Sequence, residues 1–392
     1  MKQTIIILLA LLAFPAAGAG AQGIGDVLKS IEQNNKELQA LRKDNEAATA
    51  EIKSQNNLED PSVEYSPFFR RGASGVASSE LVVSQGFDFP TVYAARSKSG
   101  KLQRETLDLQ YSAARRDILL SAKNLCFDLI HLKKMKALLD LRRKNTEELL
   151  ALFTKKLENG GATTLEVNKI KMDLMNIQTE VATMEASQQT AMQSLTALNG
   201  NAPLTFNADD YGTSNHTDSY ETMLSKAMAS DYDILTAQAS EQALEQEIKV
   251  NKQNWIPKLE IGYRRNTEGS EASNGFLVGA SFPLFSSRNK MKTAKAQHEG
   301  AQLRLDNARI EVENRVKARI QEVQKLKKAK DTYDTALLNQ TLDILRKAVE
   351  GGEISITDYY VEADNIYRNL EAYMNIEGQY QGALAEIYKN EL

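Results

Sequence analysis

Two patterns of apolar residues run along this 392-residue chain. In short segments, apolar and polar residues alternate one by one, which is typical of a β-strand with one covered face. In long segments, apolar residues recur three or four positions apart, which is typical of a helix with an apolar stripe. The chain therefore predicts two kinds of element, a few strands and several long helices.

The helical pattern is clearest in two stretches that contain no proline, residues 91–202 and 284–392. Because proline in a helix interior costs about 3 kcal/mol, its absence favours long helices. Steps of three and four residues, as from Ile118 to Ala122 and Leu125, match the seam of a coiled coil. We expect helices at residues 24–57, 93–158, 163–198, 220–252, 287–350 and 354–388.

Four short segments carry the strand pattern, and they form two pairs. Val63 and Tyr65 alternate with polar neighbours in the first pair, and Leu259 and Ile261 do so in the second. A strand of roughly 9–11 residues with this period can cross a membrane at a tilt. We expect strands at residues 61–69, 80–89, 257–265 and 275–284, each pair joined by a solvated turn.

The order of these elements repeats once. Pro61 and Pro257, which open the two strand pairs, stand 196 residues apart, and Pro90 and Pro283, which close them, stand 193 apart. Self-similarity at a nearly fixed spacing indicates a duplicated architecture. We assign residues 22–200 to a first structural repeat, 201–218 to a linker and 219–390 to a second repeat.

Residues 1–21 have the features of a secretory signal peptide, because Lys2 precedes an apolar stretch and small residues precede Gln22. We therefore expect an exported protein. Its 48 basic and 52 acidic residues give a net charge of −4, which suggests no nucleic-acid partner. The single cysteine, Cys126, cannot form an internal disulfide, and we expect it to be a buried, unreactive thiol.

A set of four strands cannot enter a membrane alone. The smallest membrane barrels have about eight strands, and lipid does not tolerate open sheet edges. If these strands enter a membrane, several chains must contribute to one barrel. The alternative is a small soluble sheet that caps a coiled coil.

Each long helix is followed by a glycine pair, then a hydroxyl residue and an acidic residue. Glycine supplies the positive φ of a tight turn, and a hydroxyl side chain caps the next helix. The residues are Gly160, Gly161, Thr163 and Glu166 in the first repeat, and Gly351, Gly352, Ser355 and Asp358 in the second.

This combination resembles the TolC-type outer-membrane efflux proteins, and the resemblance covers residues 22–392. It implies a mainly α fold with a membrane β-barrel, in which three internally duplicated chains form a trimeric tunnel of strands and coiled-coil helical hairpins. It implies a passive channel in the cell outer membrane that extends into the periplasm. The implied partners are outer-membrane lipid, a periplasmic adaptor protein and the inner-membrane pump of a tripartite efflux or type I secretion system.

The resemblance also gives the two turns a role, because such turns form the periplasmic tip that docks the adaptor. The candidate docking residues are Gly160, Gly161, Thr163, Gly351, Gly352 and Ser355. Copies of Glu166 or Asp358 around the axis would make an acidic ring at the aperture. Carboxylates at helix starts are also common because they complement the helix dipole.

Aromatic and basic residues stand at the ends of the strand pairs. Tyr93, Trp255 and Phe285 fit the aromatic belt of a membrane interface. The basic residues fit either phospholipid headgroups or an ordinary polar helix face. They are Arg96, Lys98, Lys101 and Arg104 in the first repeat, and Arg288, Lys290, Lys292 and Lys295 in the second.

The sequence shows no motif of an enzyme, a cofactor site or a metal centre. His131, His216 and His298 are isolated, and Met172 and Met175 have the spacing of helix core residues. We therefore expect no catalytic activity. Two other interpretations remain, a periplasmic adaptor with one helical hairpin between β-rich modules, and a structural coiled-coil protein of the envelope.

Overall fold

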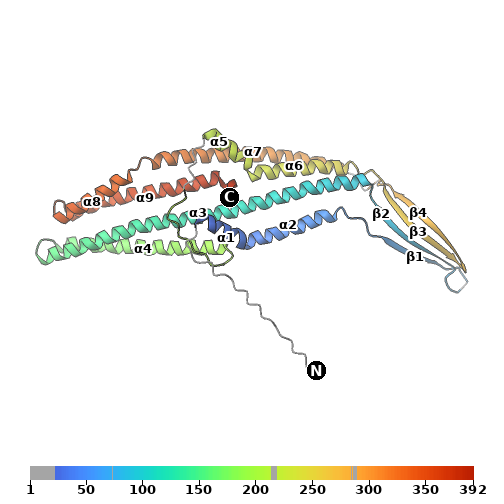
Figure 1. Ribbon diagram of the computed structural model, residues 1–392, viewed down its shortest axis with the longest axis horizontal. Helices are drawn as coiled ribbons and strands as arrows, with labels where there is room; N and C mark the ends of the chain where they lie inside the picture. The colour runs from blue at the N-terminus through green and yellow to red at the C-terminus, as the bar shows by residue number, and fades with distance from the viewer. Residues whose placement is uncertain (1–22, 73, 213–218, 284, 286–288) are drawn as a thin grey trace, which may run out of the picture. The chain divides into compact units, whose positions relative to one another are not determined.

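The computed structural model describes residues 23–72, 74–212, 219–283, 285 and 289–392. The predicted signal peptide lies outside the described residues, as do His216, Arg288 and the last part of the predicted linker. The described chain consists mainly of helices together with a four-stranded sheet, as expected (Figure 1).

The chain divides into two compact units. Unit 1 comprises residues 1–34 and 125–214, and unit 2 comprises residues 35–124 and 215–392. The boundary falls within one long helix, α3 (Pro90–Glu158). These units therefore do not follow the predicted repeats, whose limits stay a prediction.

Unit 1 is built on a coiled-coil seam between the second part of α3 and α4 (Thr164–Leu198). Leu139 of α3 packs against Ile177 and Val181, and the buried positions of α4 follow steps of three, four and seven residues. At the end of α4, the buried Asn199 accepts a hydrogen bond from the Ser30 hydroxyl (2.9 Å). That bond ties the short helix α1 (Ile24–Asn34) to α4.

Two side chains of unit 1 differ in their outcome. Cys126 is buried as expected, and burial raises the pKa of its thiol to about 12. The prediction that Met172 and Met175 fill the core is wrong, because their side chains are 52% and 56% exposed. Ile170 and Ile177 already occupy the covered side of α4, and the methionines project from another side.

Unit 2 is a bundle of helices around a continuous apolar core. Its helix α7 packs on α5, α6 and α9, and α8 packs on α9. The core joins Met223, Ile234, Val312 and Ile387 with their neighbours. The elements are α2 (Lys36–Ser54), α5 (Tyr220–Ser230), α6 (Tyr232–Asn251), α7 (Lys290–Lys330), α8 (Thr335–Gly351), α9 (Ile356–Ile387) and the 3₁₀ turn η1 (Lys389–Glu391).

Three predicted helices are interrupted, which corrects the expected spans 24–57, 220–252 and 287–350. In each case a short polar side chain caps the next helix. Asn35 accepts a bond from the Leu38 N–H (2.9 Å), and Asp334 accepts one from the Leu337 N–H (2.9 Å). Asp231 caps α6 in the same way. Such side chains offer the backbone an alternative to helix continuation.

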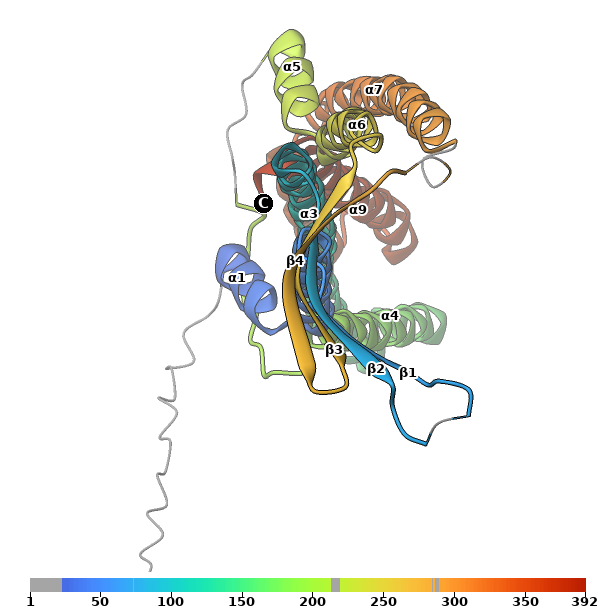
Figure 2. The same ribbon diagram turned by 90° about the vertical axis from the view of Figure 1, so that its right-hand side faces the viewer.

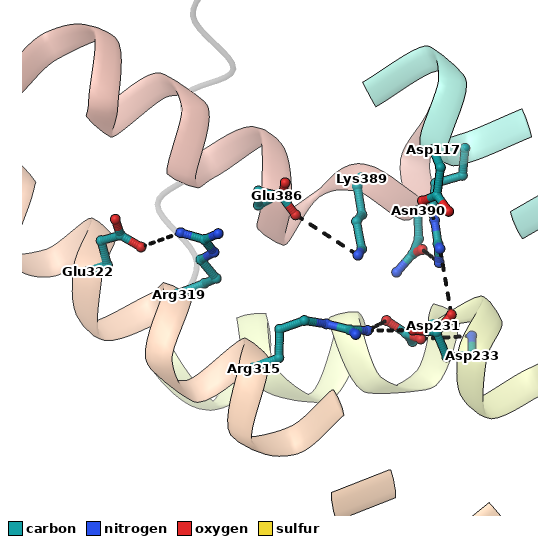
Figure 3. A network of polar contacts seen from close by, with 10 residues as sticks. Asp117, Asp231, Asp233, Arg315, Arg319, Glu322, Glu386, Lys389 and Asn390 are labelled. Carbon is teal, nitrogen blue, oxygen red and sulfur yellow. Dashed lines mark hydrogen bonds and ion pairs between the residues drawn. The ribbon is translucent and has the colours of Figure 1, made fainter. Parts of the chain in front are cut away.

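A polar network surrounds the break at Asp231 (Figure 3). The Asp231 side chain is 1% exposed, and one of its carboxylate oxygens accepts a bond from Arg315 of α7 (3.0 Å). Arg315 also reaches Asp233 (2.8 Å), which lies 3.6 Å from the buried Arg116 of α3. Arg116 donates in turn to the side chain of Asn390 (3.2 Å). The network therefore joins α3, α6, α7 and the end of the described chain.

The sheet also belongs to unit 2, and its four antiparallel strands lie in the order β1-β2-β3-β4 (Figure 2). The strands are β1 (Ser62–Phe68), β2 (Ser78–Phe87), β3 (Lys258–Glu268) and β4 (Glu271–Ser281). The last two extend beyond their predicted limits, since polar residues at 266–274 continue the ladder up to a tight turn at Gly269 (φ +58°). Within the described residues, none of the helices has both the length and the apolar character of a membrane span.

Candidate docking tips and membrane-facing sheet

The first candidate tip is the turn between α3 and α4. Gly160 has a φ of +74°, and its N–H donates to the Leu157 carbonyl (3.0 Å). The N–H of Gly161 donates to the Lys156 carbonyl (2.7 Å). These two bonds form a Schellman motif, which satisfies the last carbonyls of a helix and requires a left-handed residue. Gly160 therefore ends α3.

The return helix α4 begins with a capping box. The Thr163 hydroxyl accepts a bond from the Glu166 N–H (3.3 Å), and the Glu166 carboxylate accepts bonds from the N–H (2.7 Å) and hydroxyl (2.8 Å) of Thr163. The bonds from Thr163, with a smaller contribution from the charge of Lys156, lower the pKa of Glu166.

This cap predicts a pH dependence of the first tip. A lowered folded-state pKa means that the cap stabilises the turn fully above the ordinary value of 4.5 and loses this effect as the pH falls further. Amide hydrogen exchange at residues 163–167 should therefore accelerate below that pH, after correction for the intrinsic rate. In a Glu166→Gln variant this step should be absent, and an unchanged step would contradict the assignment.

The second candidate tip, between α8 and α9, repeats the same geometry. Gly352 has a φ of +79°, its N–H donates to Val349 (3.2 Å), and the N–H of Glu353 donates to Ala348 (2.9 Å). These bonds again form a Schellman motif.

The cap of the second tip is also built like that of the first. Ser355 accepts a bond from the Asp358 N–H (3.1 Å), and its hydroxyl donates to the Asp358 carboxylate (2.6 Å). The two tips are therefore structural copies at a spacing of 192 residues, with Gly160 matching Gly352, Thr163 matching Ser355 and Glu166 matching Asp358.

Only one glycine of each predicted pair has a positive φ. Gly161 and Gly351 have ordinary backbone angles, and a Cβ at either position would make only van der Waals contact. The backbone therefore requires Gly160 and Gly352, whereas Gly161 and Gly351 keep the surface of the tips small.

The carboxylates of Glu166 and Asp358 are engaged with their own helix caps. Their role in an aperture ring stays a prediction, as does adaptor docking by the exposed tip residues. Sequence analysis missed Leu165, whose side chain is 75% exposed beside the first cap. Its signal was an apolar residue out of phase with the buried positions Val167 and Ile170.

One face of the sheet is apolar. The register places Val63, Val83, Tyr263 and Phe276 in one row across the four strands. Residues paired directly across antiparallel strands share a face. Phe276 is 93% exposed and Val63 is 70% exposed, so this face has no cover within the described chain. An apolar face of this kind marks an interaction surface.

The other face is polar. It carries the row Ser62, Ser84 and Gly262, in which the two serine hydroxyls lie 2.8 Å apart, and the ion pair between Arg264 and Glu80 (2.5 Å). The sheet is therefore amphipathic across its full width, as the alternation in the sequence predicted.

The three predicted interface aromatics differ in their surroundings. Trp255 is 73% exposed and Phe285 is 87% exposed. Tyr93 is half-buried, and its hydroxyl accepts a bond from the Asp88 N–H (3.1 Å), so it fixes the junction between β2 and α3. Elsewhere in the described chain, no three His, Cys, Asp or Glu side chains gather in a way that could hold a metal ion.

Comparison with known proteins joins these features into one architecture. The family described as outer membrane efflux protein matches residues 27–201 and 223–390. The chain belongs to this family. The predicted family, the outer-membrane location and the function class of outer-membrane efflux are thereby confirmed at the level of the family, and the adaptor and structural-protein interpretations are set aside.

Solved structures show the same fold. A membrane protein from Pseudomonas aeruginosa superposes with a TM-score of 0.77 at 16% identity, over 94% of this chain and 90% of that one. The CmeC outer membrane channel of Campylobacter jejuni gives a TM-score of 0.69 at 16% identity, over 94% and 85%. The predicted fold class is confirmed.

A curated relative matches a shorter segment. The nickel and cobalt resistance protein CnrC of Cupriavidus metallidurans is 34% identical over 88 residues, which span 22% of this chain and 21% of CnrC. The chain therefore matches about a fifth of the length of that relative.

Proposed function

We propose that this protein is the passive outer-membrane channel of a tripartite efflux system. The observation that carries the proposal is the amphipathic sheet, whose apolar face is uncovered and whose outer strands, β1 and β4, each have one unpaired edge within the described chain. An apolar face suits lipid, and a polar face suits a water-filled lumen.

The open edges require further copies of the chain. Unpaired backbone groups are costly in lipid, so β4 of one copy must pair with β1 of the next until the sheet closes. Four strands per chain fall short of the roughly eight that the smallest membrane barrels need. A homotrimer, which the family resemblance implies, satisfies this requirement.

The helical hairpins extend this channel into the periplasm. Their tips present Gly161 and Gly351 as small exposed surfaces, which suits close approach by the helical hairpin of a periplasmic adaptor. The adaptor would connect the channel to an inner-membrane pump, which selects the substrate. Because a relative is a nickel and cobalt resistance protein, divalent metal ions are the first substrates to test.

Conductance measurements test the channel. The purified protein should form trimers in detergent and ion-conducting pores in planar bilayers, and deletion of its gene should sensitise cells to nickel, cobalt or other pump substrates. A protein that stays monomeric and never conducts would refute the proposal. Normal conductance with unchanged sensitivity to every substrate would refute the efflux role alone.

A substitution at the first tip tests docking. Gly161→Leu enlarges the tip without backbone strain, so the trimer should form normally while crosslinking to the adaptor falls on the order of tenfold, the effect of losing about 1.4 kcal/mol of binding. Ala182→Leu, at an exposed position of α4 away from the turn, is the matched control. Equal crosslinking yields for the two variants would exclude docking at this turn.

A further inference from the structure

We propose that exposed aromatic and lysine side chains where β3 and β4 join α6 and α7 form a contact surface for anionic phospholipid headgroups. This inference rests on the proposed function, because it takes the apolar face of the sheet to be in lipid. We call this surface the basal rim, and it consists of Trp255, Phe282, Phe285, Lys290, Lys292 and Lys295.

The aromatic part of the basal rim marks a membrane interface. Trp255 lies between α6 and β3, and Phe282 and Phe285 lie between β4 and α7 (Figure 1). The three side chains are 73%, 64% and 87% exposed, respectively. Aromatic side chains concentrate at the boundary between hydrocarbon and headgroups. This boundary therefore falls at the end of the strands, and α7 begins on its polar side.

The lysines of the basal rim lie at the depth of the headgroups. Lys290, Lys292 and Lys295 are exposed and belong to the first two turns of α7. At 1.5 Å per residue they fall within about 8 Å of the helix start. The headgroup region on each side of a bilayer is roughly 5–8 Å thick. The three ammonium groups can therefore reach lipid phosphates.

The other predicted basic cluster lies farther from this boundary. Lys98 and Lys101 of α3 lie roughly 12–17 Å along the helix from Pro90, which places them beyond the headgroups. Arg96 is paired with Asp88 (2.6 Å), and Arg104 donates to the Gly100 carbonyl (3.1 Å). The structure therefore favours the cluster of the second repeat for lipid contact.

The charge of the basal rim is not balanced by the described protein. Neighbouring carboxylates are already engaged, Asp88 by Arg96, Glu59 by Lys258 and Glu241 by His298. The first turn of α7 contains no acidic residue. Within the described residues, Lys290, Lys292 and Lys295 form no ion pair. Anionic headgroups supply the missing negative charge, and zwitterionic ones do not.

The only tryptophan of the chain provides a probe at the basal rim itself. The full-length protein is reconstituted in phosphatidylcholine vesicles that contain a small fraction of brominated lipid, either phosphatidylglycerol or phosphatidylcholine. Bromine quenches Trp255 fluorescence on contact, so the ratio of the two quenching constants measures the preference for the anionic headgroup. The same vesicles are assayed for ion conductance.

We expect brominated phosphatidylglycerol to quench Trp255 more strongly, and this preference should weaken as salt screens the lysines. The triple variant Lys290→Gln/Lys292→Gln/Lys295→Gln should lose the preference, by up to roughly fivefold for each lysine removed. The matched control is Lys325→Gln/Lys327→Gln/Lys328→Gln, which removes three exposed lysines from the other end of the same helix and should behave like the original protein.

Equal quenching of the original protein by both brominated lipids would overturn the proposal, and so would an unchanged preference in the triple variant of the basal rim. Normal conductance in either case would leave the channel function standing. Loss of conductance in the original protein, with Trp255 unquenched by any brominated lipid, would overturn both proposals.

Discussion

Replacing Gly262 with valine is expected to prevent assembly of the sheet. A Cβ at this position would lie 2.6 Å from the Val83 carbonyl oxygen and 2.9 Å from the Ser84 Cβ, both on the neighbouring strand β2. Overpacking of side chains alone costs about 1–3 kcal/mol. Here backbone atoms must separate as well, so we expect a loss of roughly 3 kcal/mol or more and broken hydrogen bonds between β2 and β3.

The measurement is the amount of heat-modifiable oligomer in the outer-membrane fraction, which should fall to background in Gly262→Val. Gly275→Val is the matched control, because a Cβ at Gly275 of β4 meets no atom within 4 Å and the backbone needs no positive φ there. If both variants assembled equally well, the close approach of β2 and β3 would not be needed.

Replacing Arg315 with alanine should produce the second large effect, a loss of stability in unit 2. The Asp231 carboxylate is 1% exposed and would lose its nearest cation. Removing one partner of a buried ion pair typically costs about 3–5 kcal/mol. Because the Arg315 side chain is 40% exposed, we expect about 2–3 kcal/mol in the free energy of unfolding, measured by denaturant titration in detergent.

Two further variants make this prediction specific. Arg319→Ala removes a largely exposed pair with Glu322 and should cost less than about 1 kcal/mol. Adding Asp231→Asn to Arg315→Ala should recover most of the loss, because a neutral cap needs no cation. Asn35 is such a cap, at the corresponding break 196 residues earlier. A loss in Arg315→Ala no larger than in Arg319→Ala would refute this role of the network.

The sequence predicted the long elements because their signals are long. The helix expected at residues 93–158 is α3, Pro90–Glu158, and its apolar seam runs through many turns. The strand alternation survives in the register of the sheet, where Val63, Val83 and Phe276 share a face. These patterns extend over many residues, so no single contact can reverse them.

The helix breaks were not predicted because single polar residues decide them. Asparagine and aspartate are only slightly unfavourable inside a helix, so their presence does not distinguish a cap from an exposed interior position. At Asp231 the choice depends on Arg315, which lies 84 residues away in the sequence. Long-range partners of this kind are not visible in a local pattern.

The candidate tips were predicted in composition but not in detail. Two adjacent glycines can each supply a positive φ, so the sequence left open which one does. Aligning the caps resolves it, since Thr163 and Ser355 stand 192 residues apart, as do Gly160 and Gly352. Met172 was misplaced because α4 carries apolar residues on more than one side, and periodicity does not tell which side the chain covers.

The interruption at Asp334 makes the two hairpins mechanically unequal. In the first hairpin a push on the turn travels along α3 as through an unbroken rod, since its hydrogen-bond ladder runs from Pro90 to Glu158. In the second hairpin the same push meets a pivot between α7 and α8, bridged only by neighbouring α9, where the Tyr373 ring lies 6.1 Å from that of Tyr333. One arm of the chain transmits force, and the other can absorb it by bending.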